Sequence, residues 1–257
     1  MLSRLVALAL IIASVASATD YQSHLDKTGV VVEAYTATKD TTWRYLGFRD
    51  ISRLLCCHST VDLALDYGCG TGMSSRLLRS LGYHVKGVDV SPTMLQQAKV
   101  DSPDLELSLL TDGTLPFDDE TFDLVFSSLV LFEIGSKEDL KAYMAEACRV
   151  LKPEGIFVAL TGSAEGFTGN WACFDTSFPE NPTLKSGDLG RVKDLTSGIV
   201  FTDYYWTVDD YNECLEEAGM QLVEVHSPLG EREDSIEWLD EWHTSPVVIL
   251  VARPALD

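Results

Sequence analysis

Three glycines at alternate positions separate an apolar run from a run with helical spacing in the segment LDYGCGTGMSSRLL. The apolar run at 61–67 predicts a short buried strand, and the run at 73–82, which ends in a glycine, predicts a helix. A turn without side chains lets the backbone approach a ligand closely. Because ligands bind beyond the carboxyl ends of the strands in an open α/β sheet, we expect a ligand site at Gly68, Gly70 and Gly72.

Strand-like and helix-like runs alternate through most of the chain. Further strands are expected at 84–90, 105–110, 122–132, 155–162, 221–230 and 246–254, and further helices at 92–99, 137–153 and 207–220. Ser91 followed by Pro92 predicts a helix start, as does Thr207. The alternation predicts a single α/β domain with a doubly wound, mostly parallel sheet and helices on both faces.

The spacing of the glycines argues against a dinucleotide ligand. A dinucleotide-binding turn has the pattern G-x-G-x-x-G, whereas here Met73 stands where the third glycine would be. Asp66 precedes the turn, and a carboxylate is unfavourable beside a pyrophosphate but favourable beside a cation. The turn therefore predicts a ligand that carries an amine or a sulfonium, although Asp66 also fits an ordinary strand-end carboxylate. Asp89 ends the second strand and suits either ribose hydroxyls or the N-terminus of the next helix.

Four segments together resemble the successive motifs of the class I S-adenosylmethionine-dependent methyltransferases. They are LDYGCGTG, VKGVDVSPTMLQQAK, LLTDGTLPFDDETFDLVFSS and EACRVLKPEGIFVAL, in the family's order and at its distances over about residues 60–162. The resemblance implies a seven-stranded sheet whose last strand is antiparallel, which the late strands at 221–229 and 246–253 match.

The resemblance also implies which residues bind the cofactor, S-adenosylmethionine. Gly68, Gly70 and Gly72 would bring the backbone against its amino-acid part, with Asp66 nearby, and Asp89 would hold the ribose.

For the adenine and the reactive methyl group, the resemblance implies five more residues. Met94 would pack against the adenine, unless it serves only to pack its helix. Asp112 would accept a hydrogen bond from the adenine amino group, and the Gly113 backbone would lie against the ring. Ser127 and Ser128 would lie close to the methyl group.

Two segments are expected to contact the methyl acceptor. One is the N-terminal stretch with Tyr35, Trp43, Arg44 and Tyr45, in which Tyr35 resembles a tyrosine that the family places over the cofactor. The other is residues 163–206, which show little periodicity and predict an aromatic lid. The lid rings are Phe167, Trp171, Phe174, Phe178, Tyr204, Tyr205 and Trp206. These rings suit a flat or apolar small molecule, or alternatively they pack the lid onto the sheet.

A general base does not carry over from the family, because the segment LVLFEI after the fourth strand contains no histidine. Glu133 is the best-placed candidate, and Tyr35 is the second catalytic candidate. Asp175, His226 and His243 are further candidate bases, but the two histidines better fit structural or exposed positions.

The N-terminus has the pattern of a secretory signal peptide, with Arg4, an apolar run and a small-residue cleavage site after Ala18. The run is too short for a stable membrane span. We expect secretion or entry into the secretory pathway, with a plastid route or an uncleaved anchor as alternatives. The remaining domain, 19–257, is divided into an N-terminal cap (19–60), the cofactor-binding core (60–162), the lid (163–206) and a C-terminal helix with strands (207–257).

Charge and cysteine content restrict the partners. The net charge of −21 disfavours nucleic acid as a substrate. The six cysteines have no CxxC or Cys/His spacing, so we expect no metal site, and their positions favour buried free thiols. The leading prediction is a methyltransferase for a small molecule. The alternatives are a protein methyltransferase, a non-catalytic module that binds the cofactor or a partner, and a nicotinamide oxidoreductase. The sequence leaves the oligomeric state open.

Overall fold

A computed structural model describes residues 21–22, 42–58 and 62–255 of the chain. The predicted signal peptide at 1–18 and Tyr35 lie outside these residues. Both therefore stay predictions. Of the six cysteines, Cys69, Cys148, Cys173 and Cys214 are described, and all four are free thiols.

The main sheet has seven strands in the order β10-β11-β6-β5-β2-β3-β4. Its strands are β2 (Leu63–Tyr67), β3 (His84–Asp89), β4 (Glu106–Leu109), β5 (Phe122–Ser128), β6 (Leu151–Gly162), β10 (Met220–His226) and β11 (Val247–Pro254). Strands β2 to β6 are parallel, and β11 is antiparallel to both β6 and β10. The predicted seven-stranded sheet with an antiparallel last strand is confirmed.

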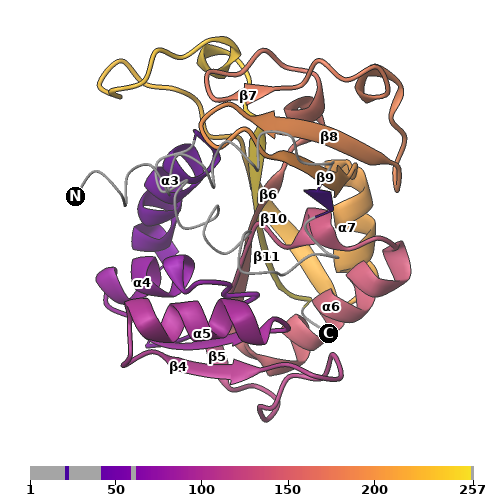
Figure 1. Ribbon diagram of the computed structural model, residues 1–257. Helices are drawn as coiled ribbons and strands as arrows, with labels where there is room; N and C mark the ends of the chain where they lie inside the picture. The colour runs from indigo at the N-terminus through magenta and orange to yellow at the C-terminus, as the bar shows by residue number, and fades with distance from the viewer. Residues whose placement is uncertain (1–20, 23–41, 59–61, 256–257) are drawn as a thin grey trace, which may run out of the picture.

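Helices cover both faces of this sheet (Figure 1). One face carries α3 (Thr42–His58), α4 (Met73–Ser80) and α5 (Pro92–Asp101), and the other carries α6 (Lys137–Val150) and α7 (Val208–Glu217). The predicted helix starts are confirmed: the Ser91 and Thr207 side chains accept hydrogen bonds from the backbone N–H groups of Met94 and Asp210. Helix α3 was not predicted, although its Ile51 and Leu55 are fully buried in the core.

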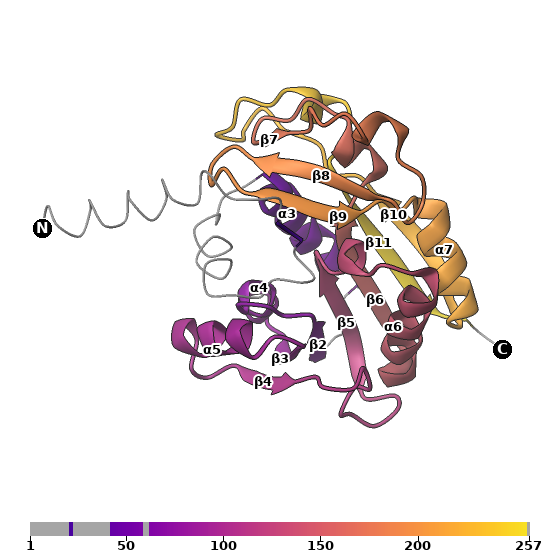
Figure 2. The same cartoon turned by 45° about the vertical axis from the view of Figure 1, so that its right-hand side comes forward.

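The predicted irregular lid is wrong for much of its length, because the segment folds into a second sheet. This sheet contains three strands of the segment, β7 (Phe174–Asp175), β8 (Leu189–Asp194) and β9 (Val200–Tyr204). The fourth strand is β1 (Tyr21–Gln22), and the order is β1-β9-β8-β7. Short 3-10 turns complete the fold: η1 (Leu131–Glu133), η2 (Ala164–Phe167), η3 (Asn181–Thr183) and η4 (Asp240–Trp242). Both views place the second sheet beyond one end of the main sheet (Figure 2).

Most of the large lid rings fill the interior. Phe167, Trp171 and Phe174 are buried in the cluster that also contains residues of α3, and Trp206 is buried in the cluster on the α6 side. Phe178 lies under the Arg191 guanidinium, 4.5 Å from ring centroid to Cζ. These rings therefore pack the segment onto the rest of the fold, as the alternative prediction stated.

Within residues 21–22, 42–58 and 62–255, no helix has both the length and the apolar character that a membrane span requires. Over the same residues, no three His, Cys, Asp or Glu side chains gather as a metal ion would need.

Candidate active site

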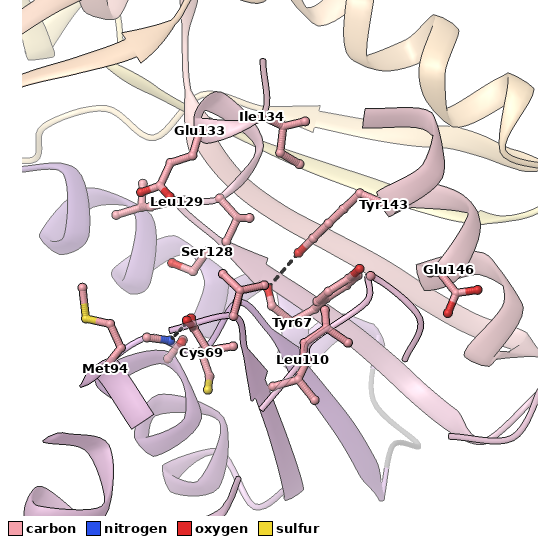
Figure 3. A pocket seen from close by; sticks show the side chains of 18 of the residues that line it. Tyr67, Cys69, Met94, Leu110, Ser128, Leu129, Glu133, Ile134, Tyr143 and Glu146 are labelled. Atoms are coloured by element: carbon pink, nitrogen blue, oxygen red, sulfur yellow. Dashed lines mark hydrogen bonds between the residues drawn. The ribbon is translucent and has the colours of Figure 1, made fainter. Parts of the chain in front are cut away.

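A cavity of about 920 Å³ lies at the carboxyl ends of β2 to β5. Its walls come from the glycine turn, the loops after β3, β4 and β5, and helices α3 and α6. Figure 3 shows Met94 and Cys69 at one end and Glu146 at the other, with Tyr67, Leu110 and Tyr143 between them. The position agrees with the rule that ligands of such sheets bind beyond the strand ends.

Two of the three glycines form the floor of this cavity. Gly70 has a φ of +50°, and a Cβ atom built on it would meet no other atom within 4 Å, so its Cα faces open space. A Cβ on Gly68 would lie 2.4 Å from Val130 Cγ2. Gly72 does not line the cavity, and a Cβ there would lie 2.9 Å from Leu105 Cδ1. Gly72 therefore permits close packing at the start of α4, and its cofactor contact stays a prediction.

Asp66 lies beneath the glycine turn and is fully buried. Its Oδ2 accepts hydrogen bonds from the hydroxyls of Ser74 (2.7 Å) and Ser75 (2.5 Å), while Oδ1 has no hydrogen-bond partner. Burial raises the pKa of this carboxyl to about 6, the two serine hydroxyls oppose the rise, and the charge of Asp89 adds to it. Asp66 does not line the cavity, but Ser74 does. Because the Ser74 proton is held by Asp66, the Ser74 oxygen offers lone pairs to a donor in the cavity.

Asp89 lines the cavity and is nearly buried. Its Oδ2 accepts from the Gly70 N–H at 2.8 Å, and its Oδ1 accepts from the Ser91 N–H at 2.7 Å. The carboxylate therefore fixes the glycine turn to the start of α5. This agrees with the alternative prediction that Asp89 serves the N-terminus of the next helix. Each of its oxygens keeps a further lone pair that can accept from a ligand hydroxyl.

The residues predicted for the adenine come together at one wall. Met94, Leu110, Asp112 and Gly113 all line the cavity. Asp112 is exposed, and its Oδ1 accepts from the Thr114 N–H at 3.1 Å, which closes a tight turn with Gly113 at a φ of +82°.

Ser127 and Ser128 point to opposite sides of β5, and only Ser128 lines the cavity. Ser127 is fully buried and its Oγ lies 2.9 Å from the Tyr143 hydroxyl. That hydroxyl donates to the Tyr67 carbonyl at 2.8 Å, and the two tyrosine rings stack with centroids 3.8 Å apart. Successive side chains of a strand face opposite sides, so Ser127 orients Tyr143 while Ser128 faces the cavity. The cofactor contact of Ser127 stays a prediction.

A further wall of the cavity is formed by α3 and by η1 with the residue after it. Arg44 and Phe48 of α3 line the cavity, as do Glu133 and Ile134. Arg44 is 8% exposed and Glu133 is half-buried. No residue of 163–206 lines this cavity, so the predicted lid contact is absent from the part of the chain that the structure describes.

Tyr204 at the end of β9 and Trp206 just after it support the segment that carries Glu133. The Trp206 indole N–H donates to the Ile134 carbonyl at 3.0 Å. A Cβ on Gly135 would lie 2.6 Å from the Tyr204 ring, so this ring lies directly against the backbone.

Of the remaining candidates, Tyr45, Asp175, His226 and His243 do not line the cavity. Tyr45 donates to Asp234 at 2.7 Å, and the Trp43 side chain is outside the described atoms. His226 pairs with Asp50 (2.7 Å from Nε2 to Oδ2), and Asp175 accepts from the Ser177 N–H. His243 is exposed at the end of η4 and does not line the cavity.

Several lining residues were not predicted from the sequence. They are Tyr67, Ser74, Phe48, Tyr143, Glu146 and Arg149. Tyr67 and Ser74 flank the glycines within the turn motif, so their sequence position was an available signal. The others come from α3 and α6, where the sequence does not show which helix face meets the cavity.

Comparison with known proteins shows which family the chain is similar to. A family model described as "Methyltransferase domain" matches residues 65–159. A demethylmenaquinone methyltransferase of Tropheryma whipplei is 33% identical over 162 residues, which cover 61% of this chain and 65% of the relative, just under two thirds. A malonyl-[acyl-carrier protein] O-methyltransferase of Buchnera aphidicola is 36% identical over 191 residues, covering 71% of this chain and 76% of the relative.

Solved structures share the fold. A putative S-adenosylmethionine-dependent methyltransferase from Listeria monocytogenes has a TM-score of 0.62 at 22% identity, over 82% of this chain and 98% of the other. The CcbJ methyltransferase from Streptomyces caelestis has a TM-score of 0.62 at 19% identity, over 93% of this chain and all of the other. The sequence relatives, the glycine turn and the sheet order together show the family. The chain belongs to the class I S-adenosylmethionine-dependent methyltransferases.

Proposed function

We propose that the protein transfers a methyl group from S-adenosylmethionine to a small-molecule acceptor by in-line displacement. The observation that carries this proposal is the floor of the cavity, where Gly68 and Gly70 present bare backbone above the buried Asp66 carboxylate. A negative charge that is held below a side-chain-free wall favours a cationic ligand.

The residues present fit the chemical groups of that cofactor. The Ser74 oxygen, polarised by Asp66, suits the amine; Asp89 suits the ribose hydroxyls; Asp112 suits the adenine amino group. When bound, S-adenosylmethionine supplies an electrophilic methyl group. The chain's own residues then have to hold the acceptor in line with that group and keep water out, and such positioning lowers the barrier without a covalent enzyme intermediate.

The acceptor side is mainly apolar, with Phe48, Leu129, Val130 and Ile134 in the wall. Such a wall suits an apolar or flat small molecule. The relatives named for demethylmenaquinone and malonyl-[acyl-carrier protein] support an acceptor of low molecular weight or one carried on a small tethered group. Trp206, just after β9, holds the Glu133 segment through its hydrogen bond to the Ile134 carbonyl.

Glu133 is proposed as the group that accepts a proton from a hydroxyl or ammonium acceptor. Replacing Glu133 by glutamine should then lower kcat about 100-fold, since a positioned base contributes roughly that factor, while the Kd for the cofactor stays within about twofold. Single-turnover kinetics and calorimetry on the same samples separate the two quantities. Glu138→Gln, an exposed site on α6, is the control. An unchanged kcat would leave Glu133 without a catalytic role.

Arg44 is proposed to bind the carboxylate of the cofactor's amino-acid part. Arg44→Met should weaken binding of S-adenosylhomocysteine about 10- to 100-fold, because a hydrogen bond to a charged group is worth about 1.5–3 kcal/mol. Binding of 5′-methylthioadenosine, which has no carboxylate, should not change. Arg53→Met on the same helix, exposed and outside the cavity, is the matched control. Equal loss for both ligands would contradict the assignment.

One set of measurements tests the function as a whole. Calorimetry with S-adenosylmethionine and S-adenosylhomocysteine should show binding, and release of labelled methyl to a panel of small metabolites should show turnover. Binding without transfer to any metabolite or protein would favour the non-catalytic module. Transfer to protein alone would favour the protein methyltransferase. Tight NADH binding without binding of either sulfur compound would reverse the proposal in favour of an oxidoreductase.

A further inference from the structure

The loop that connects β4 to β5, residues 110–121, carries the residues that face the adenine end of the cavity. Asp112 and Gly113 lie in its first half, where residues 111–114 are all exposed. We infer that Arg149 and Glu146 of α6 are positioning residues that determine specificity for adenine by holding this loop in place. The inference rests on the proposed function, because it assumes that the cavity binds an adenosyl cofactor.

The Arg149 guanidinium contacts the loop at three points. It donates to the carbonyls of Leu115 (3.0 Å) and Phe117 (2.9 Å) and to the Asp119 carboxylate (2.7 Å). It also pairs with Glu146 through two bonds of 2.9 Å. The guanidinium thus uses its fixed fork of donors on both the helix and the loop.

Glu146 adds a fourth contact with the loop. Its Oε2 accepts from the Leu115 N–H at 2.8 Å. The Arg149 hydrogen bonds are the largest cause that lowers the pKa of Glu146, so this carboxylate stays charged as an acceptor near neutral pH. Leu115 is consequently bonded at both its N–H and its carbonyl by the two α6 side chains.

The turn at Asp112 has few other attachments. Before it, the Leu110 N–H donates to the Asp89 carbonyl. Within it, the Thr114 N–H donates to Asp112 Oδ1. After it, the next fixed point is Leu115, which Arg149 and Glu146 hold. An exposed turn that lacks an anchor on one side populates many conformations, and ordering it on binding costs affinity.

The position of Asp112 matters because of the hydrogen bond that it is expected to make. A carboxylate accepts from the amino group of adenine, whereas the carbonyl oxygen at the same position of hypoxanthine faces it with like charge. A site built for a donor rejects an analogue that lacks it. Discrimination between S-adenosylhomocysteine and S-inosylhomocysteine therefore reports whether Asp112 is held in place, separately from overall stability.

The test compares the Kd values of these two compounds by calorimetry, on the full chain. The wild-type ratio of Kd for the inosyl over the adenosyl compound should be at least about 30, and Arg149→Lys should reduce it below about 5. Lysine keeps the charge but not the fork. The matched control is Arg79→Lys on α4, which changes an exposed ion pair with Asp104 and should keep the wild-type ratio. Glu146→Gln, which keeps an acceptor for the Leu115 N–H, should give an intermediate ratio.

A double-mutant cycle decides whether Arg149 acts through Asp112. If it does, Arg149→Lys should leave the ratio of an Asp112→Asn protein unchanged, since coupled sites are not additive. The inference would be overturned if Arg149→Lys kept the wild-type ratio of Kd values. It would also be overturned if Arg149→Lys changed that ratio equally in the wild-type and Asp112→Asn proteins. If Arg149→Lys does not fold, a second double-mutant cycle that combines Glu146→Gln with Asp112→Asn tests the same coupling. Failure of the wild type to bind either compound would refute the proposed function instead.

Discussion

Replacing Gly70 by leucine is expected to abolish measurable binding of S-adenosylmethionine. At this position the Cβ direction meets no protein atom within 4 Å and opens on the cavity, so the new side chain would occupy the space beside the backbone where the cofactor is expected to lie. We expect a loss of affinity of at least 100-fold, which is about 2.7 kcal/mol. Calorimetry with S-adenosylhomocysteine measures it.

The control for Gly70→Leu has to carry the same backbone strain without touching the cavity. Gly198 has a φ of +75°, compared with +50° for Gly70, and a Cβ there also meets nothing within 4 Å, but it lies in the turn between β8 and β9. Gly198→Leu should lower the melting temperature to a similar extent, because L side chains strain a left-handed backbone. Its affinity for the cofactor should not change. If both variants bind normally, the glycine turn is not the cofactor site.

Replacing Asp66 by asparagine is expected to move stability and binding in opposite directions. Burial raises the pKa of Asp66 to about 6, whereas an unfolded aspartate titrates near 3.9. Between these values the folded protein holds a proton that the unfolded chain has released, so the free energy of unfolding falls as the pH rises from about 4 to 6. At pH 7 the ligand-free Asp66→Asn protein should be more stable by about 3 kcal/mol, since the pKa rises by about two units and each unit corresponds to about 1.4 kcal/mol.

Binding of the cofactor should weaken in the same variant. Loss of the charge behind Ser74 removes the attraction for the amine, and we expect the Kd of S-adenosylmethionine to rise about 10- to 100-fold at pH 7. In the wild type, the affinity should decline as the pH falls below about 6, where Asp66 takes up its proton. Urea unfolding and calorimetry across pH 4–8 measure both effects. Asp62→Asn, an exposed carboxylate just before the same strand, is the control. Unchanged affinity with lower stability would make Asp66 an ordinary strand-end carboxylate.

The tertiary contacts also explain where the cavity lining differs from the residues that the sequence singled out. Ser127 and Ser128 are neighbours with the same side chain, and only the direction of β5 decides that Ser128 faces the cavity. Gly72 belongs to the same motif as Gly70, but it meets Leu105, a contact that spacing does not reveal. Strands β8 (LGRVKD) and β9 (VFTDY) were missed because polar and charged residues interrupt both, so they lack the near-continuous apolar runs of the central strands.

The sequence by itself determined the strands of the main sheet, the helices α4 to α7 between them, and the glycine turn at the floor of the cavity. Some signals act over only a few residues, namely helix caps such as Ser91 and Thr207, the apolar runs and the glycine spacing. Their effect can therefore be predicted from the sequence alone. Only the tertiary structure decided which distant side chains meet at the cavity, among them Arg44 from α3 and the Arg149–Glu146 pair that holds the 110–121 loop. The physical reason is that these contacts join segments far apart in the chain, and their geometry depends on how whole helices pack on the sheet.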